Sequence, residues 1–126
     1  MQLVSLVTAP VAPPAPSTAL DDAVMHLDWA HETAGSATSD PEYLSADELF
    51  GASRDAATAA ELLTSIQQPL AAQHARDAAN AFDSAGTAKL QEEPDVAAGV
   101  IASRGADAED AIHDAFAAIG MDGRGE

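Results

Sequence analysis

The chain has 126 residues, with 21 Asp or Glu against five Lys or Arg, and its net charge is −16 at pH 7. This uncompensated charge argues against direct binding to nucleic acid or to an anionic membrane, because both require a basic surface. The absence of cysteine excludes disulfides, thiolate metal sites and cysteine nucleophiles.

Residues 1–17 are predicted to be an extended or disordered arm, since the prolines of PVAPPAP at 10–16 favour polyproline II. The apolar patch in front of them is the candidate partner-binding peptide: Leu3, Val4, Leu6 and Val7. Its alternatives are packing on the domain's own surface and plain disorder. Neither a secretory signal nor an apolar run of membrane-spanning length is recognised, so we expect a cytoplasmic protein.

Residues 19–34 are predicted to form the first helix. Thr18 is placed to cap its N-terminus, with Asp21 in the capping-box position, and Gly35 is a C-terminal stop signal. A loop is expected over 35–44.

Met25 and Trp29 lie one turn apart on a different side of this first helix from its apolar stripe, so the helix has two apolar faces. Because the chain contains few other large residues, we expect Trp29 to be buried in the core. Docking of a partner on Trp29 is the alternative.

The strongest signal runs from Leu44 to Leu70. Ser45 and Glu48 form a capping box, and Leu44 and Leu49 occupy the positions of a hydrophobic staple across it. Apolar residues then recur at helical spacing: Leu49, Ala52, Ala56, Ala59, Leu63, Ile66 and Leu70. The larger residues at the end of this seam predict that most of the core's bulk lies there.

Pro69 is predicted to interrupt this helix, because its ring removes a backbone N–H and clashes with the preceding turn. A second seam follows: Ala71, Ala75, Ala78, Phe82 and Ala85. We favour two antiparallel helices over one rod, the second ending near Gly86 or at Gln91.

The last region is open to two interpretations. It forms either two short helices separated at Gly105 or one helix over 95–119, because the apolar positions are nearly in phase through Gly105. Gly120 is predicted to end the helix as the residue after its C-terminus. Residues 121–126 are assigned to a C-terminal tail.

Two Asp-x-x-His pairs bear on metal chemistry, Asp28 with His31 and Asp110 with His113. Helical spacing lets both members of a pair face one ion. We nevertheless interpret His31 as a core-edge residue and His113 as a surface residue, and predict no metal ligand, no cofactor and no catalytic residue. Metal binding remains an alternative.

Two acidic stripes follow helix faces and are candidate interaction surfaces: Asp21, Asp28 and Glu32, and Asp107, Asp110 and Asp114. They fit a solubilising surface, a mimic of nucleic-acid charge or adaptation to high salt.

These patterns together predict an all-α protein: a small bundle of four to five helices, with one helical domain over 18–120 and the arm and tail outside it. Because no catalytic motif is found, we expect a non-enzymatic interaction or accessory protein. Its partner would be another protein or a second copy of the chain, the latter because alanine-rich seams bury limited area. An acidic inhibitor of a DNA-binding protein is the first alternative, and a metal-binding bundle is the second.

Overall fold

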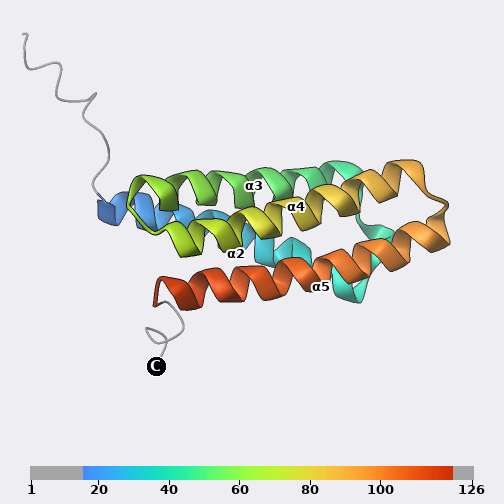
Figure 1. The fold of residues 1–126 in the computed structure, drawn as a ribbon. Coiled ribbons are helices and arrows are strands. Elements are labelled where there is room, and N and C mark those ends of the chain that lie inside the picture. Colours follow the sequence, from blue (N-terminus) through green and yellow to red (C-terminus); the bar gives the residue numbers. More distant parts are fainter. Residues whose placement is uncertain (1–15, 121–126) are drawn as a thin grey trace, which may run out of the picture.

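A computed structural model describes residues 16–120 and confirms an all-α four-helix bundle (Figure 1). Its elements are α2 (Pro16–Ser39), the short 3-10 helix η2 (Pro41–Tyr43), α3 (Ala46–Ser65), α4 (Pro69–Gln91) and α5 (Pro94–Ala118). Each long helix packs against the next one along the chain, and α5 returns to pack against α2. Consecutive helices run in opposite directions, which is the arrangement that short connections favour (Figure 1).

The beginning of α3 confirms the predicted capping box. The backbone N–H of Glu48 donates to Ser45 Oγ at 3.0 Å, and the backbone N–H of Ser45 donates to Glu48 Oε1 at 2.9 Å. Leu44 and Leu49, the two residues of the staple, are both buried. Two free donors of the first turn are therefore satisfied while the chain entering the helix is held against the core.

Replacing Ser45 by Ala removes the acceptor for the Glu48 N–H. We expect the free energy of unfolding to fall by about 1 kcal/mol, the usual cost of losing such a cap. Thr18→Ala is the matched control, because Thr18 is exposed inside α2 and does not cap it. Denaturant unfolding of both variants measures the difference, and equal losses would contradict the assignment of Ser45 as the cap.

The first helix is longer at both ends than predicted. α2 begins before Thr18 and continues past Gly35. Gly35 does not act as a stop because the following turn is held by tertiary contact: Ala37 is buried, and its Cβ faces Gly105 of α5. This contact favours continued helix over a turn at the glycine.

The break between α3 and α4 is confirmed. Gln67 has a φ of 62° in the three-residue connection, and Pro69 opens α4, where its missing N–H costs nothing. All five residues of the second predicted seam are buried. Leu70 is 62% exposed, so the expectation that it belongs to the core is wrong. The reason is that the proline shifts the helical register, which turns Leu70 outward.

Of the two interpretations of the last region, one continuous helix is correct. Gly105 lies in the middle of α5 and is buried against Ala37, where a Cβ would come within 2.5 Å of the Ala37 Cβ. Gly105 therefore permits close packing of α5 on α2. Gly120, whose φ is 78°, lies just beyond the helix end, as predicted.

The core consists mainly of alanine. Its largest fully buried side chains are Phe82, Leu27, Leu49, Leu63, Ile101 and Ile112. They come from all four helices, so the bulk is not concentrated before Pro69 as the sequence suggested. Small residues elsewhere in the core let the helix backbones approach closely, but each contributes little buried area.

Candidate functional site

The predicted site residues are an apolar peptide near the N-terminus, two acidic stripes and Trp29. Leu3, Val4, Leu6 and Val7 lie outside the described residues. The acidic stripe of α2 (Asp21, Asp28 and Glu32) and that of α5 (Asp107, Asp110 and Asp114) are exposed. Trp29 is also exposed, which overturns its predicted burial.

Trp29 lies on the outside of α2 because a different set of residues, at helical spacing, occupies the side of this helix that faces the core. That side consists of Ala23, Leu27, Ala30, Ala34 and Ala37, all fully buried. Trp29 is 47% exposed, and Met25, one turn earlier, is 39% exposed. The chain therefore places its single tryptophan on the surface while it fills the core with alanine.

The ring of His26 holds Trp29 on one side. The two rings meet edge to face with centroids 5.3 Å apart, and His26 Nδ1 lies 3.0 Å from Asp55 Oδ1 of α3. Trp29 is thus supported by a neighbour that is itself tied to the next helix. Large exposed aromatic side chains held in this way are typical of interface anchors.

Exposed acids surround Met25 and Trp29. Helical spacing gathers six exposed residues on one side of α2, which we call the α2 outer face: Asp21, Asp22, Met25, Asp28, Trp29 and Glu32. No Lys or Arg occurs in residues 1–53, so α2 supplies no positive charge to this face.

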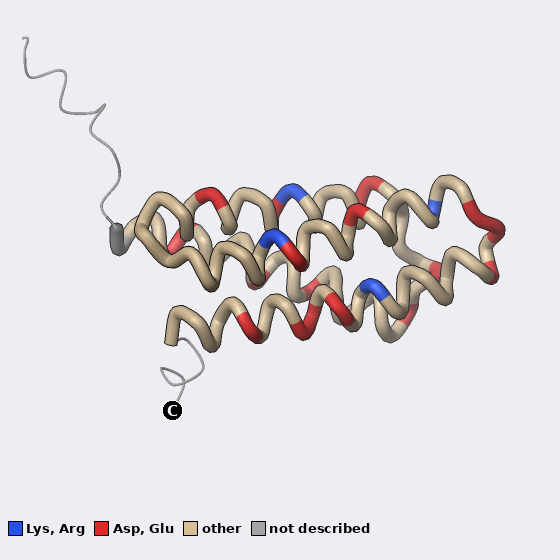
Figure 2. Tube along the Cα trace, viewed as in Figure 1, with Lys and Arg blue, Asp and Glu red and all other residues tan. Residues whose placement is uncertain are grey.

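Negative charge is distributed over the whole bundle (Figure 2). Acidic segments recur on every helix and around the α4–α5 turn, whereas basic residues are few and isolated. On α5, Arg104 Nη1 lies 2.9 Å from Asp107 Oδ2, which is the one ion pair to a Lys or Arg within residues 16–120. The α5 stripe is therefore partly compensated, unlike the α2 outer face.

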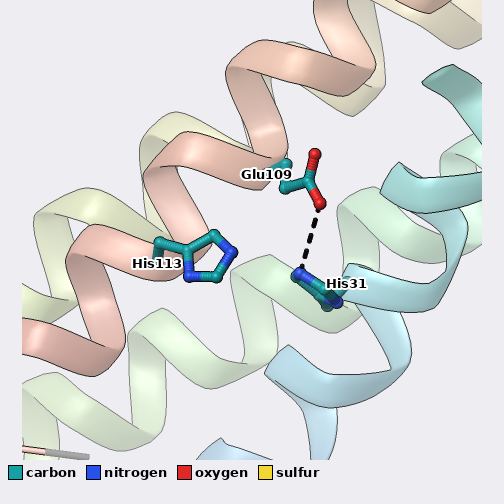
Figure 3. A group of neighbouring side chains, drawn as sticks. All are labelled: His31, Glu109 and His113. Carbon is teal, nitrogen blue, oxygen red and sulfur yellow. Dashed lines mark ion pairs between the residues drawn. The ribbon is translucent and has the colours of Figure 1, made fainter. Parts of the chain in front are cut away.

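A second group of polar side chains lies between α2 and α5: His31, Glu109 and His113 (Figure 3). One ligand atom from each residue lies within 4.8 Å of the others. His31 Nε2 is 3.5 Å from Glu109 Oε2, and the rings of His31 and His113 meet edge to face with centroids 5.2 Å apart. Two imidazoles and a carboxylate are ligands typical of Zn²⁺ and other first-row transition metals.

His31 Nε2 has an unusual environment in this group. The atom is buried from solvent, yet no hydrogen-bond partner satisfies it. Glu109 Oε2, at 3.5 Å, is too distant for a good hydrogen bond, although it is close enough for an ion pair when His31 is protonated. A buried nitrogen without a partner costs free energy, so this atom favours a ligand that accepts its lone pair.

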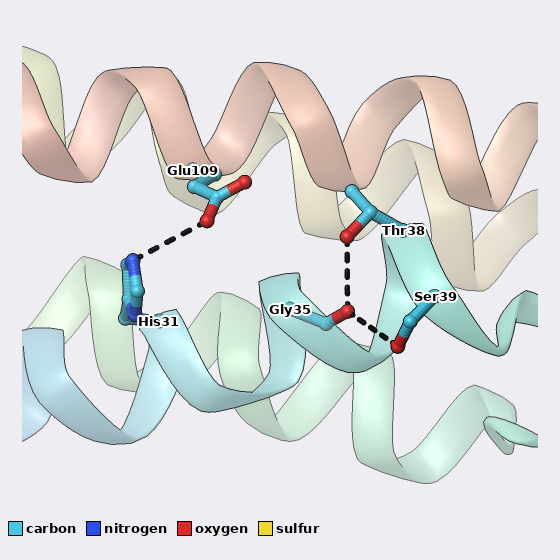
Figure 4. A network of polar contacts seen from close by, with 5 residues as sticks. All are labelled: His31, Gly35, Thr38, Ser39 and Glu109. Carbon is cyan, nitrogen blue, oxygen red and sulfur yellow. Dashed lines mark hydrogen bonds and ion pairs between the residues drawn. The ribbon is translucent and has the colours of Figure 1, made fainter.

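His31 lies well inside α2 because the helix continues beyond Gly35 (Figure 4). The Gly35 carbonyl accepts hydrogen bonds from Thr38 Oγ1 and Ser39 Oγ, both at 2.9 Å. These hydroxyls add side-chain hydrogen bonds to the last turns of α2, where the Asp40 N–H still donates to the Ser36 carbonyl at 2.7 Å. The turn that carries His31 is thereby kept away from the fraying end of the helix.

The structure brings together His31 and His113 from the two predicted pairs, but not their Asp partners. Asp28 and Asp110 are exposed and belong to the acidic stripes. The carboxylate beside the histidines is Glu109, four residues before His113. The sequence contains this Glu-x-x-x-His spacing as a signal. Only the packing of α2 against α5 shows that Glu109, and not Asp110, lies beside the two histidines.

A groove of about 310 Å³ lies between α4 and α5. Its lining is Asp83, Ser84, Thr87, Ala88, Gln91, Glu92, Val100 and Arg104. Arg104 already pairs with Asp107, and no histidine belongs to this lining. Among the described residues, no ion pair or side-chain hydrogen bond joins two members of this lining.

No protein-family model, curated protein or solved structure matches this chain. Within residues 16–120, no helix has both the length and the apolar character needed to cross a membrane.

Proposed function

We propose that the protein is a non-enzymatic acidic binding protein whose α2 outer face receives a basic surface of another protein. One observation carries this proposal: Trp29 and Met25 are exposed among four acids, on a helix that has no Lys or Arg. Tryptophan is enriched among the residues that contribute most to binding. Surrounding negative charge accelerates association with a positively charged partner.

A second copy of this chain is a less favoured occupant of the α2 outer face. Two copies would each bring a net charge of −16, and neither would supply cations from α2. Like charges at an interface cost free energy, most of all at low salt. We therefore infer that the partner of the α2 outer face is a basic protein and not a second copy of this chain.

A DNA-binding protein is one class of basic partner, which would make this chain a mimic of nucleic-acid charge. Such a mimic needs acids in extended rows that match the phosphates. The α2 and α5 stripes belong to different helices, and Asp107 of the second row is paired with Arg104. We therefore favour an anchored contact on the α2 outer face over charge mimicry.

The test compares two variants with the same change in charge. The first carries Asp21→Asn, Asp28→Asn and Glu32→Gln on α2, and the second carries Asp107→Asn, Asp110→Asn and Asp114→Asn on α5. Proteins captured from the native source are quantified with wild type, both variants and Trp29→Ala. We expect a basic protein that is lost with the α2 variant and with Trp29→Ala but retained by the α5 variant. When the purified basic protein is titrated into this chain, the fluorescence of Trp29 should change, and the affinity should fall as the salt concentration rises.

Equal capture by the α2 and α5 variants, or no such protein at all, would contradict the proposal. Displacement of the partner by duplex DNA would instead support the mimic. Size-exclusion chromatography with light scattering tests self-association: a dimer that Trp29→Ala dissociates would show that a second copy occupies the face.

A further inference from the structure

We propose that His31, Glu109 and His113 form a binding site for one divalent transition-metal ion, of the class represented by Zn²⁺. The site is separate from the α2 outer face and does not depend on the function proposed for that face. Its ligand atoms would be an imidazole nitrogen of His31 on α2, an imidazole nitrogen of His113 on α5 and a carboxylate oxygen of Glu109 on α5 (Figure 3).

The spacing of these groups is close to what a metal ion requires. Two ligand atoms at about 2.1 Å from a tetrahedral ion lie roughly 3.4 Å from each other. His31 Nε2 and Glu109 Oε2 are 3.5 Å apart. All three ligand atoms already lie within 4.8 Å of one another, so small side-chain rotations of His113 and Glu109 would complete the set.

The His26–Asp55 pair provides an internal comparison. There the histidine nitrogen and the carboxylate oxygen are 3.0 Å apart, which is a normal hydrogen-bond distance, so the two groups satisfy each other. At His31 the carboxylate stands farther off, a second imidazole is adjacent, and Nε2 has no hydrogen-bond partner. Both pairs join neighbouring helices, but only the His31 group leaves a buried ligand atom unsatisfied among other metal ligands.

The backbone that carries the ligands is held by close packing of α2 against α5. Gly105 approaches Ala37, and the core-facing residues Ala34 and Ala108 are fully buried. This packing fixes the separation of the helices that bear His31 and Glu109. The side chains themselves are partly exposed, so an ion can enter from solvent without opening the bundle.

Binding is measured by calorimetric titration of tag-free protein with ZnCl₂ alone, and by the visible absorption of Co²⁺ at the same site. We expect one ion per chain. His31→Gln, Glu109→Gln and His113→Gln should each weaken binding about tenfold or more, since even residues outside the ligand shell can contribute that much. In wild type, Zn²⁺ should shift the ring NMR signals of His31 and His113 and leave those of His26 and His74 unchanged.

Two control variants separate this site from general attraction of cations to an acidic protein. Asp110→Asn removes the same charge as Glu109→Gln from the adjacent, exposed position. His26→Gln removes the histidine of the other His–carboxylate pair. Both should bind Zn²⁺ as wild type does. Equal weakening by Asp110→Asn and Glu109→Gln, shifts of all four histidines, or the lack of one-to-one binding would each overturn the proposal.

Discussion

Replacing Phe82 by Ala is expected to lower the free energy of unfolding by about 3–5 kcal/mol, the usual cost of removing a buried phenyl ring. Phe82 is fully buried and is the largest such side chain in the described core. Many of the other core residues are alanines, whose short side chains cannot move to fill the space. The cavity would therefore remain open, and its cost would add to the lost burial of the ring.

Denaturant unfolding followed by circular dichroism measures this loss. Leu90→Ala is the control on the same helix, because Leu90 is 68% exposed in the last turn of α4. We expect its effect to stay within about 0.5 kcal/mol of zero. If both substitutions had the same effect, Phe82 would not be the centre of the core.

Two glycines of α5 should respond in opposite ways to the same added methyl group. Gly105→Ala places a Cβ 2.5 Å from the Ala37 Cβ and 3.3 Å from the Ala34 carbonyl oxygen, and the first of these distances is too short for two carbon atoms. We expect a loss of about 1–3 kcal/mol, the range for overpacking, because α2 and α5 must separate. Gly99→Ala meets nothing within 4 Å. It should raise the free energy of unfolding by up to about 1 kcal/mol, because alanine favours helix.

Thermal and denaturant unfolding of the two alanine variants, measured side by side, check this difference in sign. Helix propensity favours the substitution equally at both positions, so the gap between them reports the contact with α2 alone. Stabilisation of similar size at both positions would show that α5 does not approach α2 at Gly105.

Local signals in the sequence were sufficient for α3 and for the boundary that follows it. The capping box of Ser45 and Glu48 involves atoms three residues apart, so no distant part of the chain is needed to form it. Pro69 likewise acts through its own ring and missing N–H. Such short-range effects predicted the start of α3, the break before α4 and the buried seam of α4.

Predictions that depended on the partner of a helix were less reliable. Gly35 is a reasonable stop signal for an isolated helix, but the contact of Ala37 with Gly105 extends α2 beyond it. The rule that the largest residues are buried places Trp29 in the core. In the bundle, alanines take the inner positions of α2, and the tryptophan is left outside.

For the candidate metal ligands, too, the sequence identified some of the residues, but the packing of the helices decided which of them lie together. The sequence identified His31 and His113 as possible ligands, but it paired them with Asp28 and Asp110 on the basis of spacing alone. Which carboxylate lies beside them depends on the rotation of α5 against α2, which buries Gly105 and turns Glu109 toward His31.

The sequence by itself determined the helical class, the N-terminal cap of α3, the break after it and the acidic surface, because these follow from neighbouring residues and from composition. Only the tertiary structure decided the length of α2, the continuity of α5, the exposure of Trp29 and the grouping of His31, Glu109 and His113. These depend on how closely two helices approach and how each is rotated, which is set by packing between residues far apart in the chain.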